Sequence, residues 1–222
     1  MKTNHLENTK KLVTVALFCA LAYIAMNFRI NVSFLTYDLK DAFITIGAMF
    51  LGPVAGIAIS VIVALLEFIT VSDTGPYGLI MNIISSTVFA CVPALIYKYK
   101  RKLLGAILGL SISCICTVAV MMIANLCITP YYMNVDTEAV VALIPTLLLP
   151  FNAIKSVLNA SLVLLLYKPI IKALRASKLI KAASVNNTSQ QKNTSTIVVL
   201  ITSIVLIIIC LLLLFVYMAA TI

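Results

Sequence analysis

The chain has 222 residues, of which 63% are hydrophobic and only 10% charged, and its mean hydropathy is +1.14. This composition excludes both an ordinary soluble domain and a disordered chain. The apolar runs are long enough for transmembrane helices, and the sequence lacks the short alternating segments of a membrane β-barrel. We therefore predict an all-α integral membrane protein.

Seven apolar runs follow one another, at residues 12–28, 42–51, 54–71, 79–97, 103–128, 144–167 and 197–218. Gly52 and Pro53 separate the short second run from the third, because proline cannot continue a helix but suits the first turn of the next one. The first six runs predict a membrane domain at residues 1–176. A stretch rich in Asn, Ser and Gln predicts a polar cytoplasmic linker at 177–196, and residues 197–222 predict an additional C-terminal transmembrane helix.

The net charge of +9 is concentrated in three segments: before the first run, between the fourth and fifth runs, and after the sixth. By the positive-inside rule these segments lie in the cytoplasm. The loops on the other side carry mainly acidic side chains, at Asp38, Asp41, Asp73, Asp136 and Glu138. We therefore predict acidic outer loops and a multi-pass membrane protein with a cytoplasmic N-terminus.

One lysine, Lys155, lies well inside an apolar run, with Asn152 and Asn159 beside it at helical spacing. Offsets of three and seven residues bring these three side chains onto one side of a helix. An ammonium in hydrocarbon is costly, so such a lysine usually faces the bundle interior, a wet cavity or a ligand. The alternative is that Lys155 snorkels to the headgroups, since Pro145 and Pro150 leave the start of its helix open.

Other polar side chains also interrupt the apolar runs. They are Glu67, Asn82, Ser85, Ser86 and Asn125. Each could simply form an interhelical hydrogen bond, but together they could converge with Asn152 and Lys155 below the outer loops. Amides, one lysine and flanking aromatic rings suit a flat, neutral to weakly acidic ligand with several hydrogen-bonding edges.

Residues for catalysis or metal binding are scarce in the sequence. The only histidine is His5, and neither a zinc-binding helix pattern nor a phosphate-binding Gly-Lys-Ser/Thr loop occurs. The six cysteines lie within apolar runs, where they serve as small packing residues. We predict no enzymatic activity, no metal site and no cofactor. Because the phosphate-binding loop is missing, a transporter driven by ATP would need nucleotide-binding subunits from other chains.

Several motifs occur in an order that resembles a known family. They are Ala16-x-x-x-Ala20, Phe34 to Asp38 ahead of Leu51-Gly52-Pro53, Thr74-Gly75-Pro76 through Asn82, Asn125 ahead of Pro130, and Pro150-Phe151-Asn152-Ala153-Ile154-Lys155. The last element is the most specific, and the set spans roughly residues 10 to 175. The chain thus resembles the riboflavin-specific substrate-binding (S) components of energy-coupling factor (ECF) vitamin transporters.

The resemblance implies a six-helix bundle in a bacterial cell membrane that captures riboflavin from outside. It also implies association with a transmembrane coupling (T) subunit and two cytoplasmic ATPases. The implied contacts are Asn125, Asn152 and Lys155 as hydrogen-bonding partners of the flavin, Tyr37 and Leu79 as enclosing residues, and Ala16 and Ala20 as the docking face for the coupling subunit. The additional C-terminal helix departs from the family pattern.

Three alternatives stay open from the sequence. The chain could be an S component for another vitamin, such as thiamine. It could be a membrane scaffold whose polar residues only hold helices together. A membrane-embedded enzyme is a third possibility, against which the missing cluster of acid, base and nucleophile argues. For Ala16 and Ala20, internal helix packing is the alternative to partner docking.

Overall fold

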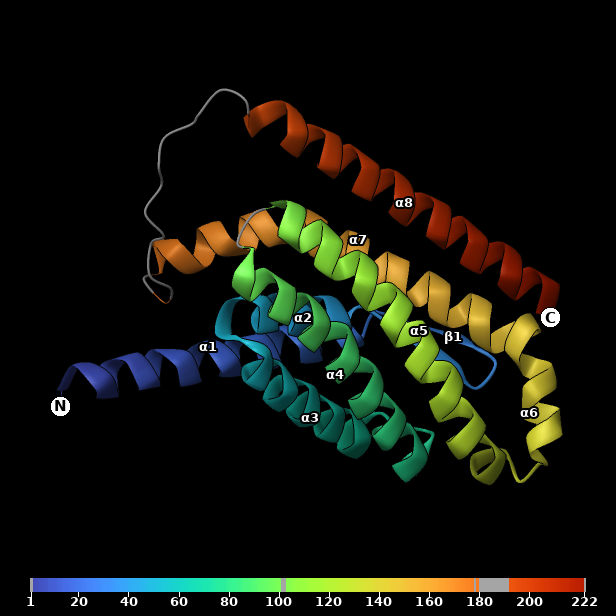
Figure 1. Cartoon of the computed structure of the whole chain (residues 1–222). Coiled ribbons are helices and arrows are strands. Elements are labelled where there is room, and N and C mark those ends of the chain that lie inside the picture. The colour runs from blue at the N-terminus through green and yellow to red at the C-terminus, as the bar shows by residue number, and fades with distance from the viewer. Residues whose placement is uncertain (1, 101–102, 178, 180–191, 222) are drawn as a thin grey trace.

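The computed structural model describes residues 2–100, 103–177, 179 and 192–221. Its helices are α1 (Lys2–Met26), α2 (Lys40–Leu51), α3 (Pro53–Thr70), α4 (Gly75–Tyr99), α5 (Leu103–Met133), α6 (Thr137–Leu143), α7 (Leu149–Ala176) and α8 (Lys192–Thr221). A π-helical turn at Ile144–Leu148 joins α6 to α7. An antiparallel hairpin of β1 (Arg29–Val32) and β2 (Leu35–Asp38) joins α1 to α2. Figure 1 shows these elements as one bundle.

Within the described ranges, six helical stretches are long and apolar enough to cross a bilayer, and α8 contains one of them. The other five stretches and the short helix α2 make up the predicted six-helix bundle. Its 12 residues extend about 18 Å at 1.5 Å per residue, against about 30 Å for the hydrocarbon core. The prediction of an all-α membrane protein, with a six-helix bundle and an additional C-terminal helix, is confirmed.

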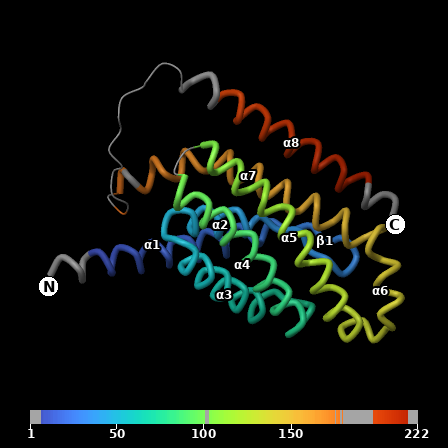
Figure 2. The backbone as a smooth tube through the Cα atoms, viewed as in Figure 1, coloured from blue at the N-terminus to red at the C-terminus, as the bar shows by residue number. Residues whose placement is uncertain are grey.

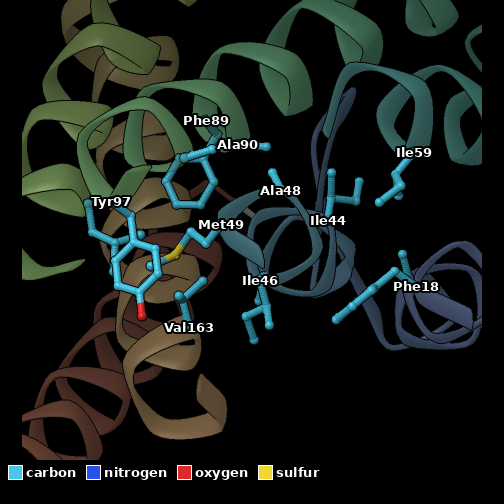
Figure 3. Packing of buried hydrophobic residues seen from close by; sticks show 14 of the residues in the cluster. Phe18, Ile44, Ile46, Ala48, Met49, Ile59, Phe89, Ala90, Tyr97 and Val163 are labelled. Carbon is cyan, nitrogen blue, oxygen red and sulfur yellow. The ribbon is translucent and has the colours of Figure 1, made fainter. Parts of the chain in front are cut away.

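Helix α2 lies at the centre of the hydrophobic core. Figure 3 shows Phe18 of α1, Ile59 of α3, Phe89 of α4 and Val163 of α7 arranged around it. Nine of its 12 residues are buried, which explains why the helix is apolar around most of its circumference. The elements that carry the polar side chains described below are therefore fixed around a common core.

Two prolines shape this core, one at the break between α2 and α3 and one inside α4. Gly52 ends α2 with a φ of 100°, a conformation that suits glycine, and its N–H donates to the carbonyl of Ala48 at 2.8 Å, after which Pro53 starts α3. Inside α4, Pro93 cannot donate to the carbonyl of Phe89. The hydroxyl of Ser113 on α5 donates to that carbonyl at 2.7 Å. Helix α5 thus supplies the hydrogen bond that Pro93 cannot make.

The hairpin replaces part of the segment predicted as an outer loop. Val32 pairs with Leu35, so the turn has only two residues, and the first of them, Ser33, takes a positive φ of 55°. Glycine or asparagine usually fills this position in tight hairpins. The strands alternate apolar and polar residues, which is the pattern of a half-buried hairpin.

The C-terminal helix α8 runs alongside α7, and the backbone view shows the bundle between α8 and the pair α1 and α3 (Figure 2). The helix is described from Lys192, so it includes the last residues assigned to the linker. Most of the predicted linker 177–196 lies outside the described residues. The proposed division at 176 and 197 stays a prediction.

Candidate ligand-binding site

A cavity of about 120 Å³ opens between the hairpin tip and the ends of four helices, α3, α4, α5 and α7. Its lining combines polar and apolar side chains and includes Arg29, Phe34, Leu35, Thr36, Glu67, Ser72, Asp73, Thr74, Tyr77, Met81, Asn82, Ser85, Met121, Asn125, Thr129, Tyr132, Phe151, Asn152 and Lys155. A concave site that combines apolar walls with a few directed polar groups is typical of small-molecule binding.

The buried side of α7 supplies one wall of this cavity. Asn152, Lys155 and Asn159 are all buried, at 4%, 9% and 1% exposure. The predicted common face is therefore confirmed. Lys155 donates from Nζ to the backbone oxygen of Thr36 at 3.2 Å and lies 3.5 Å from Oδ2 of Asp38. These contacts contradict the alternative that Lys155 snorkels to the headgroups.

Lys155 belongs to a buried network of ionic side chains. Oδ2 of Asp38 lies 3.0 Å from Nζ of Lys40, and the same nitrogen lies 2.5 Å from Oε2 of Glu67. Asp41 adds a third acidic side chain to this buried group and accepts a hydrogen bond from Ser86 at 2.5 Å. The network thus joins the hairpin to α2, α3, α4 and α7.

Asp38, Lys40 and Asp41 belong to the segment between the first two apolar runs, and the structure buries all three. Their exposures are 2%, 1% and 3%. An unpaired charge is too costly to bury. Asp38 and Lys40 form ion pairs across elements, and the carboxyl group of Asp41 accepts a hydrogen bond from Ser86. The sequence contains one signal for this arrangement, because Glu67 and Lys155 each interrupt an apolar run and therefore need partners of opposite sign.

The pKa of Asp38 follows from this pairing. Burial alone would raise the pKa of its carboxyl group, but the ammonium groups of Lys155 and Lys40, together with hydrogen bonds from Lys40, hold the pKa below its ordinary value. Asp38 is therefore a carboxylate at neutral pH. It keeps Lys155 at the cavity wall.

Two asparagines present amide groups to the same space. Asn125 donates to the carbonyl of Met121 at 2.7 Å and accepts from Thr129 at 2.9 Å, while Asn152 donates to the carbonyl of Leu148 at 2.8 Å. Each side chain is held by its own helix, so its orientation is fixed before a ligand arrives. Asn82 also lines the cavity and, within the described part of the chain, has no hydrogen-bonding partner.

Aromatic rings stand over the mouth of the cavity. Tyr132 at the end of α5 lies 6.2 Å from the ring centre of Phe34 and 6.3 Å from that of Tyr77. Such rings can stack on or pack edgewise against a planar ligand. Arg29 ties the start of the hairpin to the end of α3, because it donates to the carbonyl of Val71 at 3.0 Å.

Of the five residues predicted to bind a ligand, the structure brings Asn125, Asn152 and Lys155 together at the cavity. Tyr37 and Leu79 are not among the residues that line it. Tyr37 belongs to strand β2, and its side chain is buried in a cluster with residues of α7 and α8. Leu79 is half-buried on α4. Their contact with a ligand stays a prediction. The predicted docking residues Ala16 and Ala20 are exposed on α1, so internal packing does not occupy them in this chain.

Residues 10–167 match the family described as the substrate-specific component of ECF transporters. The chain belongs to this family. It is 28% identical to the riboflavin transporter RibU of Staphylococcus aureus (strain TCH60), over 74% of this chain and 92% of the relative. It is also 28% identical to the riboflavin transporter FmnP of Bacillus subtilis (strain 168), over 76% and 97% of the two chains.

A solved structure described as the S component of a bacterial ECF transporter has the same fold. The two structures agree with a TM-score of 0.66 at 26% sequence identity, over 76% of this chain and 99% of the other. ECF substrate-specific components are parts of transporters and not enzymes, which confirms the prediction that this chain catalyses no reaction. The family match ends before α8 begins.

Proposed function

We propose that this chain is the riboflavin-binding component of an ECF vitamin transporter in a bacterial cell membrane. The observation that carries the proposal is the convergence of Asn125, Asn152 and Lys155 at one cavity under a rim of aromatic rings. The names of the two curated relatives support riboflavin as the ligand.

The chemistry of the cavity suits the riboflavin ring system. The flavin has one edge on which carbonyl oxygens alternate with an imide N–H, and asparagine side chains can both donate to and accept from such an edge. The ammonium of Lys155 would donate to a ring oxygen or nitrogen in a charge-assisted hydrogen bond. Phe34, Tyr77 and Tyr132 would cover the ring from the outer side.

Transport would need other chains, since this one lacks a nucleotide-binding motif. We infer that it associates with a T subunit and two ATPases, through the face of α1 that exposes Ala16 and Ala20. Small residues let another membrane helix approach closely. The orientation that agrees with the positive-inside rule has a cytoplasmic N-terminus, so the cavity opens toward the outside.

The proposal is tested by titrating the purified protein with riboflavin and following the quenching of flavin fluorescence, with thiamine as a competitor. Riboflavin should quench and thiamine should not compete. A hydrogen bond to a charged group contributes about 1.5–3 kcal/mol, so Lys155→Met should raise the dissociation constant about 10- to 150-fold. The control is Lys172→Met, which changes an exposed lysine of the same helix.

Three results would contradict the proposal. One is the absence of quenching by the unaltered protein. Another is displacement of riboflavin by thiamine at similar concentration, which would indicate an S component for the other vitamin. The third is an equal affinity of Lys155→Met and the unaltered protein, which would remove Lys155 from the site.

A further inference from the structure

The inward side of α8 forms a narrow stripe. Ser203, Cys210 and Leu214 are buried at 1%, 4% and 2% exposure, and Ile207 between them is half-buried. The spacing of three and four residues is that of a helix packed along another helix. Most neighbouring residues face outward, as Leu212 does at 59% exposure. Membrane anchoring alone requires apolar residues but no such stripe.

The C-terminal part of this stripe belongs to a hydrophobic cluster that includes residues of the hairpin. Cys210 and Leu214 share that cluster with Val32 and Tyr37 of the two strands and with Phe151 of α7. Tyr37 is 2% exposed, so the cluster covers it almost completely. α8 therefore contributes to the packing behind the hairpin as well as along α7.

The opposite side of the same hairpin faces the ligand site. Asp38, next to Tyr37 in β2, pairs with Lys155, and the carbonyl of Thr36 accepts the hydrogen bond from the same ammonium. Phe151 belongs to both regions, since it lines the cavity and packs in the cluster. Strand β2 thus lies between the α8 cluster and the charged wall of the cavity.

We propose that α8 braces the β-hairpin from behind and thereby raises the affinity of the site, a role that rests on the proposed function. Without the side chains of Cys210 and Leu214, Val32 and Tyr37 would lose part of their packing. The hairpin would then sample positions in which Thr36 and Asp38 no longer hold Lys155. A ligand would bind a smaller population of the competent arrangement, which weakens its apparent affinity.

The test compares two inward variants with one outward control in the full-length protein, reconstituted in lipid nanodiscs. Leu214→Ala removes a large side chain from the cluster that includes Val32 and Tyr37, and Cys210→Leu overpacks the same cluster. Leu212→Ala makes the same change as the first variant on the exposed side of the same helix. Fluorescence quenching gives the dissociation constant of riboflavin, and rapid mixing gives its rate of release.

Both inward variants should raise the dissociation constant about five- to tenfold, mainly through faster release, while Leu212→Ala stays within about twofold of the unaltered protein. Equal riboflavin affinity of the unaltered protein and the three variants overturns the proposal that α8 braces the hairpin. An equal loss in Leu212→Ala also overturns it, because the effect would then belong to the helix as a membrane anchor. Absence of riboflavin binding by the unaltered chain contradicts the proposed function first and removes the brace with it.

Discussion

Replacing Lys40 by methionine should strongly destabilise the protein. Lys40 is 1% exposed and lies 3.0 Å from an oxygen of Asp38 and 2.5 Å from an oxygen of Glu67. Methionine keeps most of the length of the side chain but removes its charge. The printed ion pairs join Lys40 and Lys155 to Asp38 and Glu67, so the variant removes the ammonium group that pairs with Glu67 and one of the two that pair with Asp38.

The size of the effect follows from burial. Removing one partner of a buried pair typically costs about 3–5 kcal/mol, because an uncompensated charge stays in a weakly polarisable surrounding. We expect this loss in the free energy of unfolding, measured by denaturant titration in detergent micelles. The exposed Lys172→Met should change the same free energy by no more than about 0.5 kcal/mol.

A second substitution tests whether the pairing causes the loss. Glu67→Gln removes a negative charge from the same network, so the double variant Lys40→Met/Glu67→Gln should be more stable than the sum of the two single losses predicts. A loss below about 1 kcal/mol in Lys40→Met would refute the reasoning. So would strict additivity of the two substitutions, since it would mean that Lys40 and Glu67 do not interact.

Three further predictions concern the amide wall, the docking face and the proline in α4. Asn152→Leu should weaken riboflavin binding at least tenfold in a quenching titration because it removes a buried amide; a change in stability alone would support the scaffold alternative. Ala16→Phe should abolish riboflavin uptake by cells that coexpress the coupling subunits, yet leave binding by the purified protein unchanged; unimpaired uptake would contradict docking on α1. Ser113→Ala should cost about 1–3 kcal/mol in denaturant titrations because it leaves the Phe89 carbonyl unpaired, and an unchanged midpoint would show that another group satisfies it.

Local rules predicted much of the fold from the sequence. The apolar runs gave the helices, and Gly52 with Pro53 gave the break between α2 and α3, because both signals act within a few residues. The common face of Asn152, Lys155 and Asn159 followed from helical geometry alone. These features need no knowledge of which helices are neighbours.

The hairpin was missed for a local reason as well. Ile30, Val32, Leu35 and Tyr37 alternate with polar residues, which is a readable strand pattern. The turn between them lacks the glycine or asparagine that usually marks a tight hairpin, and Ser33 takes the positive φ instead. The segment therefore resembled an ordinary loop between two membrane helices.

The sequence indicates that Glu67 and Lys155 need partners of opposite sign, but the pairings themselves could not be predicted, because the partners come from distant parts of the chain. Asp38 and Lys155 are separated by 117 residues, and Lys40 and Glu67 by 27. The sequence placed Lys155 beside a ligand, whereas the structure also pairs it with Asp38. Only the packing of the hairpin against α7 brings those two charges together.

The central claim is that a planar vitamin binds in the cavity bounded by Asn125, Asn152 and Lys155. The most direct measurement is an experimental structure of the protein purified with riboflavin. We predict density for the three-ring system inside the cavity, with Nζ of Lys155 within hydrogen-bonding distance of the flavin. Density for riboflavin elsewhere on the protein, with this cavity empty, would contradict the account.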